Sequence, residues 1–171
     1  MSDKVEKSLK DIIDSATPVD KDYIFDITEK LLEILLKLSK EKPPLIHGNI
    51  TPSNIIIKDD GSLELINFNS ERKKPFLLPK KEIKLTIQSD LYLLGLTLVN
   101  LTTKKDISEL LVLDNKVQFR RDTGIDRYYK NLLDDLIHPN PKFRIKNPKK
   151  ALKHLLKVKK GKFGLDPFAR R

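Results

Sequence analysis

The sequence predicts a mainly α-helical fold with one small β-hairpin. Residues 22–40 carry apolar side chains at three- and four-residue steps, and residues 88–101 are apolar almost throughout, so both are expected to be helices. The short apolar runs 54–58 and 63–68 are separated by Asp59-Asp60-Gly61, a sequence typical of a hairpin turn. The expected architecture is therefore a helical domain that contains one hairpin.

The N-terminal part of the chain is expected to hold two helices. Residues 6–14 form a short candidate, which the Pro-containing stretch 16–20 ends. The longer helix at 22–40 stops before Pro43 and Pro44, because proline cannot continue a helix. The apolar positions that predict its buried face are Ile24, Ile27, Leu31, Ile34, Leu35 and Leu38.

The C-terminal half is expected to alternate loops and helices around the apolar helix at 88–101. Residues 71–84 are expected to form a loop, and residues 107–111 a short helix. Residues 125–137 and 148–158 have the spacing of amphipathic helices, and Pro148 suits a first helical turn.

The composition is that of a globular protein. Hydrophobic residues make up 39% of the 171 residues and charged residues 34%, and the absence of Cys excludes disulfides and thiolate metal sites. No apolar run approaches the roughly 20 residues that span a bilayer, and the first residues lack the apolar core of a secretory signal. We therefore expect a cytoplasmic protein with one domain at residues 1–158 and a basic tail at residues 159–171.

Positive charge is concentrated at the C-terminal end. Residues 141–171 hold twelve basic residues and one acid, a local charge of +11, which leaves −1 for residues 1–140 out of a total of +10. This asymmetry indicates an acidic partner, either a nucleic acid, an anionic membrane surface or an acidic protein face, or else a solvated face that aids solubility. The residues expected to bind an anion are Lys149, Lys150, Lys153, Lys157, Lys159, Lys160 and Lys162.

A histidine- and asparagine-containing loop precedes the predicted hairpin. His47, Asn49 and Asn54 follow the spacing His-x-Asn-x-x-x-x-Asn, and Asn67-Phe68-Asn69 closes the second strand. This pair of motifs resembles the catalytic loop and the Asp-Phe-Gly metal motif of protein kinases, with Asn in place of both aspartates.

Two further stretches extend the resemblance. Residues 88–95 are similar to the Ser-Asp-x-Tyr-x-Leu-Gly signature that opens the central buried helix of kinases, and residues 138–144 resemble the Asp-Pro-x-x-Arg stretch before their last helix. Four pieces in this order over residues 8–157 resemble the C-terminal lobe of a bacterial-type serine/threonine kinase. The resemblance implies a kinase C-lobe-like helical domain in which Asp90 is a buried acid that holds the catalytic-loop backbone.

No counterpart of the N-terminal kinase lobe is recognised. Only 46 residues precede His47, and they contain neither a Gly-x-Gly-x-x-Gly loop nor a strand with a Val-Ala-x-Lys lysine. The resemblance also places Lys80 where kinases have a glutamate that pairs with the arginine matching Arg144. Two like charges would then face each other, so we expect the local packing to differ there.

The substituted residues argue against phosphoryl transfer. Kinases use one aspartate to orient the substrate hydroxyl and another to hold the metal ion. Asn49 and Asn67 lack that charge, and an amide is neither a useful base near neutral pH nor the carboxylate that Mg²⁺ usually requires. Thr51 stands where many kinases have a lysine near the transferred phosphate. We therefore expect no catalytic residue, no cofactor and no metal at the degenerate positions His47, Asn49, Thr51, Asn54, Asn67, Phe68 and Asn69.

The retained residues have structural explanations. An asparagine beside a turn, as at Asn54, is expected to satisfy backbone groups. A buried aspartate such as Asp90 must be paired to persist, and Arg144 is also assigned a structural role. The remaining matched side chains, expected in the core, are His47, Phe68 and Tyr92.

Three hypotheses for function follow. The leading one is a noncatalytic, pseudokinase-like lobe that acts as a scaffold or regulatory subunit. It would bind a protein or itself through apolar surface exposed by the missing lobe, namely Ile55, Ile57 and Leu65 and the N-terminal end of the helix at 22–40. The first alternative is binding of nucleic acid or an anionic surface through residues 142–171. The second is the nucleotide-binding half of a split kinase whose other lobe comes from another chain.

Overall fold

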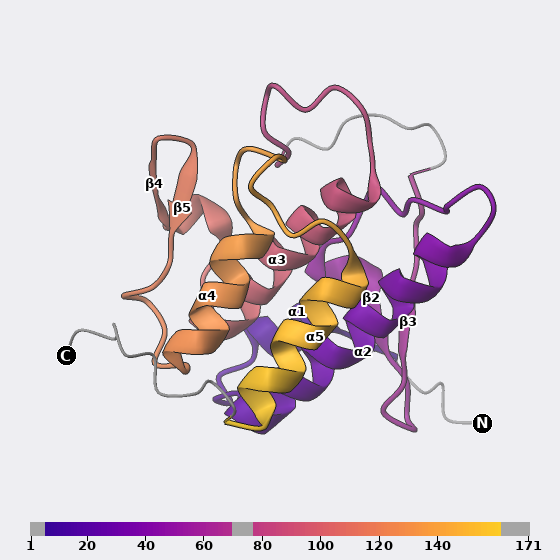
Figure 1. The fold of residues 1–171 in the computed structure, drawn as a ribbon. Coiled ribbons are helices and arrows are strands. Elements are labelled where there is room, and N and C mark those ends of the chain that lie inside the picture. The colour runs from indigo at the N-terminus through magenta and orange to yellow at the C-terminus, as the bar shows by residue number, and fades with distance from the viewer. Residues whose placement is uncertain (1–5, 70–76, 162–171) are drawn as a thin grey trace.

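The computed structural model of the protein describes residues 6–69 and 77–161, and helices dominate it (Figure 1). The predicted mainly α-helical class with a small hairpin is confirmed. The elements within these residues are β1 (Lys7–Ser8), α1 (Leu9–Asp14), α2 (Lys21–Lys40), η1 (Pro52–Asn54), β2 (Ile55–Ile57), β3 (Leu63–Leu65), α3 (Ile87–Thr103), η2 (Ile107–Glu109), β4 (Leu111–Leu113), β5 (Lys116–Gln118), α4 (Arg127–Leu136) and α5 (Pro148–Lys159), where η denotes a short 3-10 helix.

Helix α3 is the centre of the core. Every residue from Ser89 to Leu101 is buried, which explains the apolar character of this stretch. The helix begins with a capping box in which Thr86 accepts from the backbone N–H of Ser89 and Ser89 accepts from that of Thr86. Helices α2 and α4 pack on it, and α5 lies along α2 (Figure 1).

The helix predicted at 22–40 is confirmed as α2. Asp20 caps its N-terminus by accepting from the backbone N–H of Tyr23, so the helix begins at Lys21. The apolar positions split into the buried Ile24, Ile27, Leu31 and Leu35 and the partly buried Ile34 and Leu38. No helix in the described ranges has both the length and the apolar character that crossing a bilayer would require.

The helix predicted at 6–14 is shorter than expected. Lys7 and Ser8 instead form a strand that pairs antiparallel with Ile56 and Ile57, giving a sheet of order β1-β2-β3. Helix α1 begins only at Leu9, because Ser8 acts as its N-cap. A strand of only two residues has no sequence pattern of its own, and β1 forms because it can pair with the edge of β2.

The hairpin at β2 and β3 does not present an apolar face to solvent, contrary to the sequence-based prediction. Ile55 is completely buried, Leu65 is nearly so, and Ile57 is partly buried against the same core. At the N-terminal end of α2, Ile24 and Phe25 are buried as well. The chain covers these apolar groups with its own helices and with β1.

A second hairpin was not predicted. Strands β4 and β5 pair antiparallel, with Leu113 opposite Lys116, where a helix was expected to reach residue 111. Asp114 and Asn115 form the two-residue turn with φ of 51° and 62°, the left-handed conformation that Asp and Asn tolerate. The helices predicted at 125–137 and 148–158 correspond to α4 and α5. The basic tail falls outside the described residues beyond Gly161.

Candidate functional site

The loop at residues 47–54 is held from beneath by α3. The two carboxylate oxygens of Asp90 accept the backbone N–H groups of His47 and Gly48 at 2.8 and 2.7 Å. Gly48 has φ of 70°, and a Cβ there would meet Leu85 Cδ1 at 2.8 Å, so both backbone conformation and space favour glycine at this position. Asp90 therefore fixes the backbone of this loop from a site with 2% of its surface exposed.

The same burial perturbs the protonation of Asp90. Loss of solvent raises the pKa of its carboxyl group to about 6, although the N–H donors of Gly48 and His47 act in the opposite direction. His47 is completely buried, and burial lowers its pKa. Its Nδ1 accepts from the N–H of Asn49 at 3.1 Å, so the neutral ring carries its proton on Nε2 and donates to the carbonyl oxygen of Ile66 at 3.0 Å.

The second segment, residues 66–69, closes over the loop by backbone contacts. The N–H of Asn69 donates to the carbonyl oxygen of His47 at 2.8 Å, and its side-chain amide donates to that of Gly48 at 3.2 Å. Phe68 was expected in the core, but 39% of its surface is exposed. Its ring packs on the His47 imidazole with centroids 4.2 Å apart, so it covers the loop from outside.

Three of the four asparagines at the degenerate positions, Asn49, Asn54 and Asn67, form a closed cycle of side-chain amide donors. Asn49 donates to the carbonyl oxygen of Asn67 at 3.0 Å, Asn67 donates to Oδ1 of Asn54 at 3.0 Å, and Asn54 donates to the carbonyl oxygen of Asn49 at 2.9 Å. Asn67 has φ of 58°, which asparagine adopts more readily than most residues. A carboxylate at any of these positions would lack the donor that the cycle uses. We refer to Asn49, Asn54 and Asn67 as the asparagine cycle.

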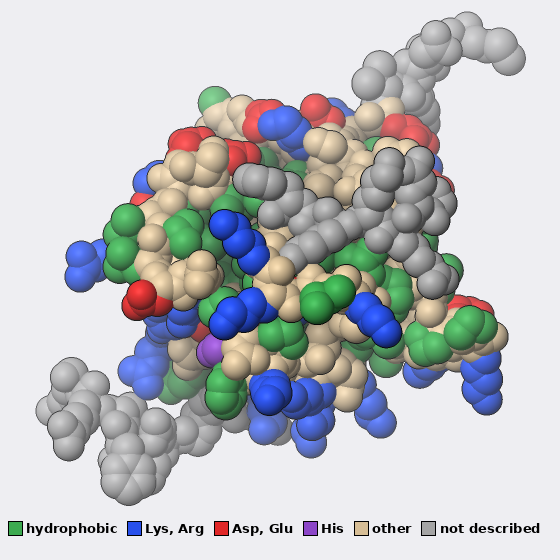
Figure 2. All heavy atoms as spheres, turned by 90° about the horizontal axis from the view of Figure 1, so that it is seen from above, with side chains coloured by type: hydrophobic (Ala, Val, Ile, Leu, Met, Phe, Trp, Pro, Cys, Tyr) green, Lys and Arg blue, Asp and Glu red, His purple; other side chains and the backbone are tan. Residues whose placement is uncertain are grey.

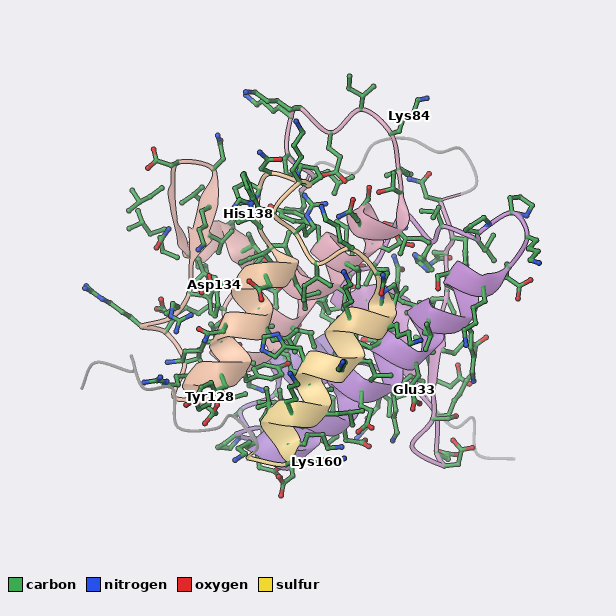
Figure 3. The ribbon with its side chains drawn as sticks, in the orientation of Figure 1. Glu33, Lys84, Tyr128, Asp134, His138 and Lys160 are labelled. Carbon is green, nitrogen blue, oxygen red and sulfur yellow. The ribbon has the colours of Figure 1, made fainter. Side chains whose placement is uncertain are left out.

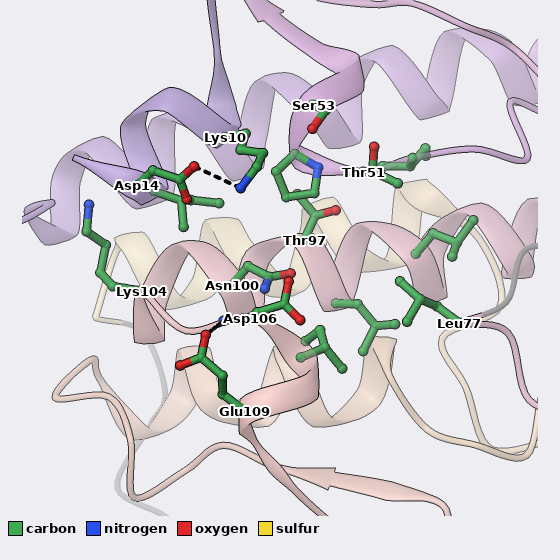
Figure 4. A pocket seen from close by; sticks show the side chains of 16 residues that line it. Lys10, Asp14, Thr51, Ser53, Leu77, Thr97, Asn100, Lys104, Asp106 and Glu109 are labelled. Atoms are coloured by element: carbon green, nitrogen blue, oxygen red, sulfur yellow. Dashed lines mark hydrogen bonds and ion pairs between the residues drawn. The ribbon is translucent and has the colours of Figure 1, made fainter.

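Thr51 does not join the asparagine cycle. It lines a separate pocket of about 520 Å³ between η1, α1, α3 and η2 (Figure 4). Lys10 and Asp14 form an ion pair at its rim, and the buried Thr97 and Asn100 form part of its wall. The seven positions matched in the sequence are therefore divided between two sites. Nowhere in the described ranges do three His, Asp or Glu side chains gather as metal ligands.

Arg144 is paired with Glu82, not with Lys80. Its two terminal nitrogens contact the two carboxylate oxygens of Glu82 at 3.2 and 3.0 Å, and its guanidinium lies 4.6 Å from the centre of the Tyr92 ring. The assignment of Lys80 to the position opposite Arg144 is therefore wrong, because Glu82, two residues further along the chain, occupies that position. Arg144 and Glu82 are 1% and 8% exposed, so this ion pair is a buried tie between two loops.

The lysines predicted to bind an anion lie mostly on the exposed face of α5. Lys159 forms an ion pair with Glu29 of α2 and is therefore engaged within the chain. Lys162 lies outside the described residues. The exposed members of the set are Lys149, Lys150, Lys153, Lys157 and Lys160, with Lys159 at the edge of the same face.

No protein-family model matches the chain. A stretch of 96 residues is 30% identical to part of U-box domain-containing protein 32 of Arabidopsis thaliana, covering 50% of this chain and 12% of that protein. Half of the chain thus matches a small part of that relative, and this similarity does not assign the chain to a family.

Proposed function

We propose that the chain is a noncatalytic, pseudokinase-like lobe that acts by binding another protein as a scaffold or regulatory subunit. The asparagine cycle is the observation that carries this proposal. Its amide groups are directed at one another and at backbone carbonyls, with distances of 2.9 to 3.0 Å. A kinase site needs carboxylates at two of these positions to hold Mg²⁺ and to orient the nucleophile.

Two structural ties are consistent with the kinase resemblance that underlies the proposal. Asp90 anchors the backbone of His47 and Gly48, the role that the resemblance implies for it. Glu82 and Arg144 form the kind of acid–arginine pair that the resemblance implies between the loop before α3 and the stretch before α5. These two contacts support the proposal of a kinase-like lobe, and the amides at Asn49 and Asn67 support the proposal that it lacks catalysis.

A phosphotransfer assay tests the absence of catalysis. The protein would be incubated with radiolabelled ATP, Mg²⁺ or Mn²⁺, and myelin basic protein or casein as acceptor. We expect no incorporation above a protein-free control, because an amide at Asn49 cannot accept the substrate proton. Label transfer that is lost in Asn54→Ala but retained in the exposed-turn variant Asn115→Ala would reject the proposal and favour a split kinase.

The lysine face of α5 supports a second candidate function, binding of an anionic polymer or surface. Lys149, Lys153 and Lys157 recur at four-residue steps on the side opposite the buried Ala151 and Leu155. Binding through this face would weaken steeply with salt, because displaced counterions drive such association. Fluorescence anisotropy of labelled oligo(dT) across a salt series, with Lys153→Ser/Lys157→Ser as the variant, separates this candidate from the first.

A further inference from the structure

A largely apolar groove lies at the end of the molecule away from the α5 C-terminus. It has a volume of about 650 Å³ and is walled by residues 77–81, by the β4–β5 hairpin and by residues 139–141. Tyr92 and Leu96 of α3 line it from the core side. Its size is within the range of about 300–1,000 Å³ in which proteins bind small ligands or side chains of a partner.

Exposed apolar side chains occur in or close to the segments that wall this groove. Ile83 is 88% exposed and Phe143 is 70% exposed, although both are adjacent in sequence to the buried Glu82–Arg144 pair. The three residues of β4 are each more than half exposed, and Val112 among them lines the groove. Exposed apolar side chains that gather in segments next to an apolar groove indicate an interaction site.

Lysines are the exposed charged residues of the two loops beside the groove. Residues 77–86 and 138–147 together carry Lys80, Lys81, Lys84, Lys142 and Lys146, whereas their single acid, Glu82, is buried against Arg144. Figure 2, which looks onto this end of the molecule, shows Lys and Arg side chains among hydrophobic ones, with Asp and Glu mainly toward the margins. Among the charged residues that line the groove itself, Lys80 and Lys81 outnumber the exposed Asp114, so the surface combines apolar contacts with a rim of net positive charge.

An ion pair and hydrogen bonds fix the two loops, residues 77–86 and 138–147, relative to each other. Arg144 binds Glu82 with both terminal nitrogens and also donates to the carbonyl oxygens of His138 and Gln88 at 3.1 and 2.9 Å. Gln88 in turn donates to the carbonyl oxygen of Pro141 at 3.0 Å. A surface that is fixed before binding loses less conformational entropy when a partner arrives.

We propose that this lysine-rimmed groove docks an acidic segment of another protein that inserts apolar side chains. The proposal rests on the proposed function as a binding lobe and specifies its partner. Charge complementarity selects the occupant: a second copy in a two-fold arrangement would set lysines against lysines, and the chain's own residues 162–171 are net positive. Ile83 and the aliphatic residues of β4 suit protein side chains, whereas single-stranded nucleic acid is bound mainly by aromatic stacking.

Binding of a defined peptide tests this inference. The probe is a fluorescein-labelled peptide of alternating Glu and Leu residues with one Phe, and two matched peptides replace Glu by Gln or the apolar residues by Ser. We expect saturable binding of the first peptide only, weakened by salt, with NMR amide shifts confined to residues 77–86, 111–117 and 139–146. Equal binding of the Ser-substituted peptide would contradict insertion of apolar side chains.

Matched variants locate the site. Ile83→Ser/Phe143→Ser is expected to weaken binding about tenfold, as loss of apolar anchors commonly does, while Leu45→Ser, at another exposed apolar residue, leaves it unchanged. Lys81→Ser/Lys84→Ser removes rim charge and is also expected to weaken binding. Its control, Lys157→Ser/Lys160→Ser, removes the same charge from the far end of α5, since Lys84 and Lys160 lie at opposite ends of the molecule (Figure 3).

Four results would overturn the inference. The first is the absence of saturable peptide binding, and the second is an equal loss of peptide affinity in the two lysine double variants. The third is preferential binding of oligo(dT) or phosphatidylserine vesicles through Ile83 and Phe143. The fourth is self-association that Ile83→Ser/Phe143→Ser abolishes. None of these results would indicate catalysis, so the proposed function is judged separately by phosphotransfer.

Discussion

The side-chain amide of Asn67 donates to Oδ1 of Asn54 at 3.0 Å, and this contact joins the segment after β3 to the loop before β2. It depends on the left-handed backbone of Asn67, with φ of 58°, which directs the side chain toward η1. The asparagines at these positions are thus structural ties between two loops. Replacement of Asn67 by the aspartate that kinases have at this position would alter stability as well as charge.

We predict that Asn67→Asp destabilises the fold by about 1–3 kcal/mol, because a carboxylate brings an acceptor against Oδ1 of Asn54 where a donor is needed. Urea unfolding at neutral pH measures the change. Asn115→Asp is the matched control, since Asn115 has φ of 62° and is exposed in the β4–β5 turn. Equal stability of the two variants would contradict the structural role of the asparagine cycle.

We predict that Glu82→Gln lowers the free energy of unfolding by about 3–5 kcal/mol, because it leaves the buried guanidinium of Arg144 without a counter-ion. Lys80→Gln, at the position that the sequence resemblance placed opposite Arg144, should change stability by no more than about 0.5 kcal/mol. Chemical denaturation of both variants distinguishes the two assignments. A larger loss in Lys80→Gln would show that the pairing is wrong.

The sequence was sufficient to predict the elements with strong periodic patterns. Helix α2 has apolar residues such as Ile24 and Leu31 at helical spacing and is followed by Pro43, while α3 is an apolar run too long for a strand. Strand β1 was missed because a strand of two residues has no period to detect. The Asp114-Asn115 turn between apolar residues was the available signal for the second hairpin.

The candidate site was predicted as a set of positions but not as an arrangement. The spacing from His47 to Asn54 located the loop, yet the asparagine cycle depends on the left-handed backbone of Asn67, which the sequence does not specify. The partner of Arg144 was misassigned because alignment to a motif fixes a sequence position, whereas irregular backbone decides whether residue 80 or 82 reaches the arginine. Exposure of Ile83 and Phe143 also depends on how these loops fold.

We predict that Asp90 makes the fold less stable as pH rises from about 4 to 7. Its pKa is about 6 in the folded protein against 3.8 for the ordinary group, so the folded state binds more protons between these values. The stabilisation is complete below pH 4 and is lost as pH rises through 6, by at most about 3 kcal/mol at 1.36 kcal/mol per pKa unit.

Urea unfolding of the wild type and of Asp90→Asn across this pH range isolates that contribution, because the asparagine does not titrate. The stability difference between wild type and variant should shrink as pH rises. A difference that is constant or that grows with pH would show that Asp90 does not have a raised pKa.

We predict that Gly95→Ala destabilises the fold by about 1–3 kcal/mol through overpacking between α3 and α4. A Cβ at Gly95 would lie 2.6 Å from Ile137 Cγ2 and 2.8 Å from Leu136 Cβ. Gly124→Ala is the control, because nothing lies within 4 Å of a Cβ at that position. Thermal unfolding compares the two, and a Gly95→Ala protein as stable as the control would contradict the packing of these helices.

Calorimetric titration of the protein with ATP in the presence of Mg²⁺ tests the central claim most directly, since the account treats the asparagine cycle as a structural tie rather than a nucleotide and metal site. We predict no saturable heat of binding for the wild-type chain. Saturable, Mg²⁺-dependent binding that Asn54→Ala abolishes while Asn115→Ala preserves it would contradict the account.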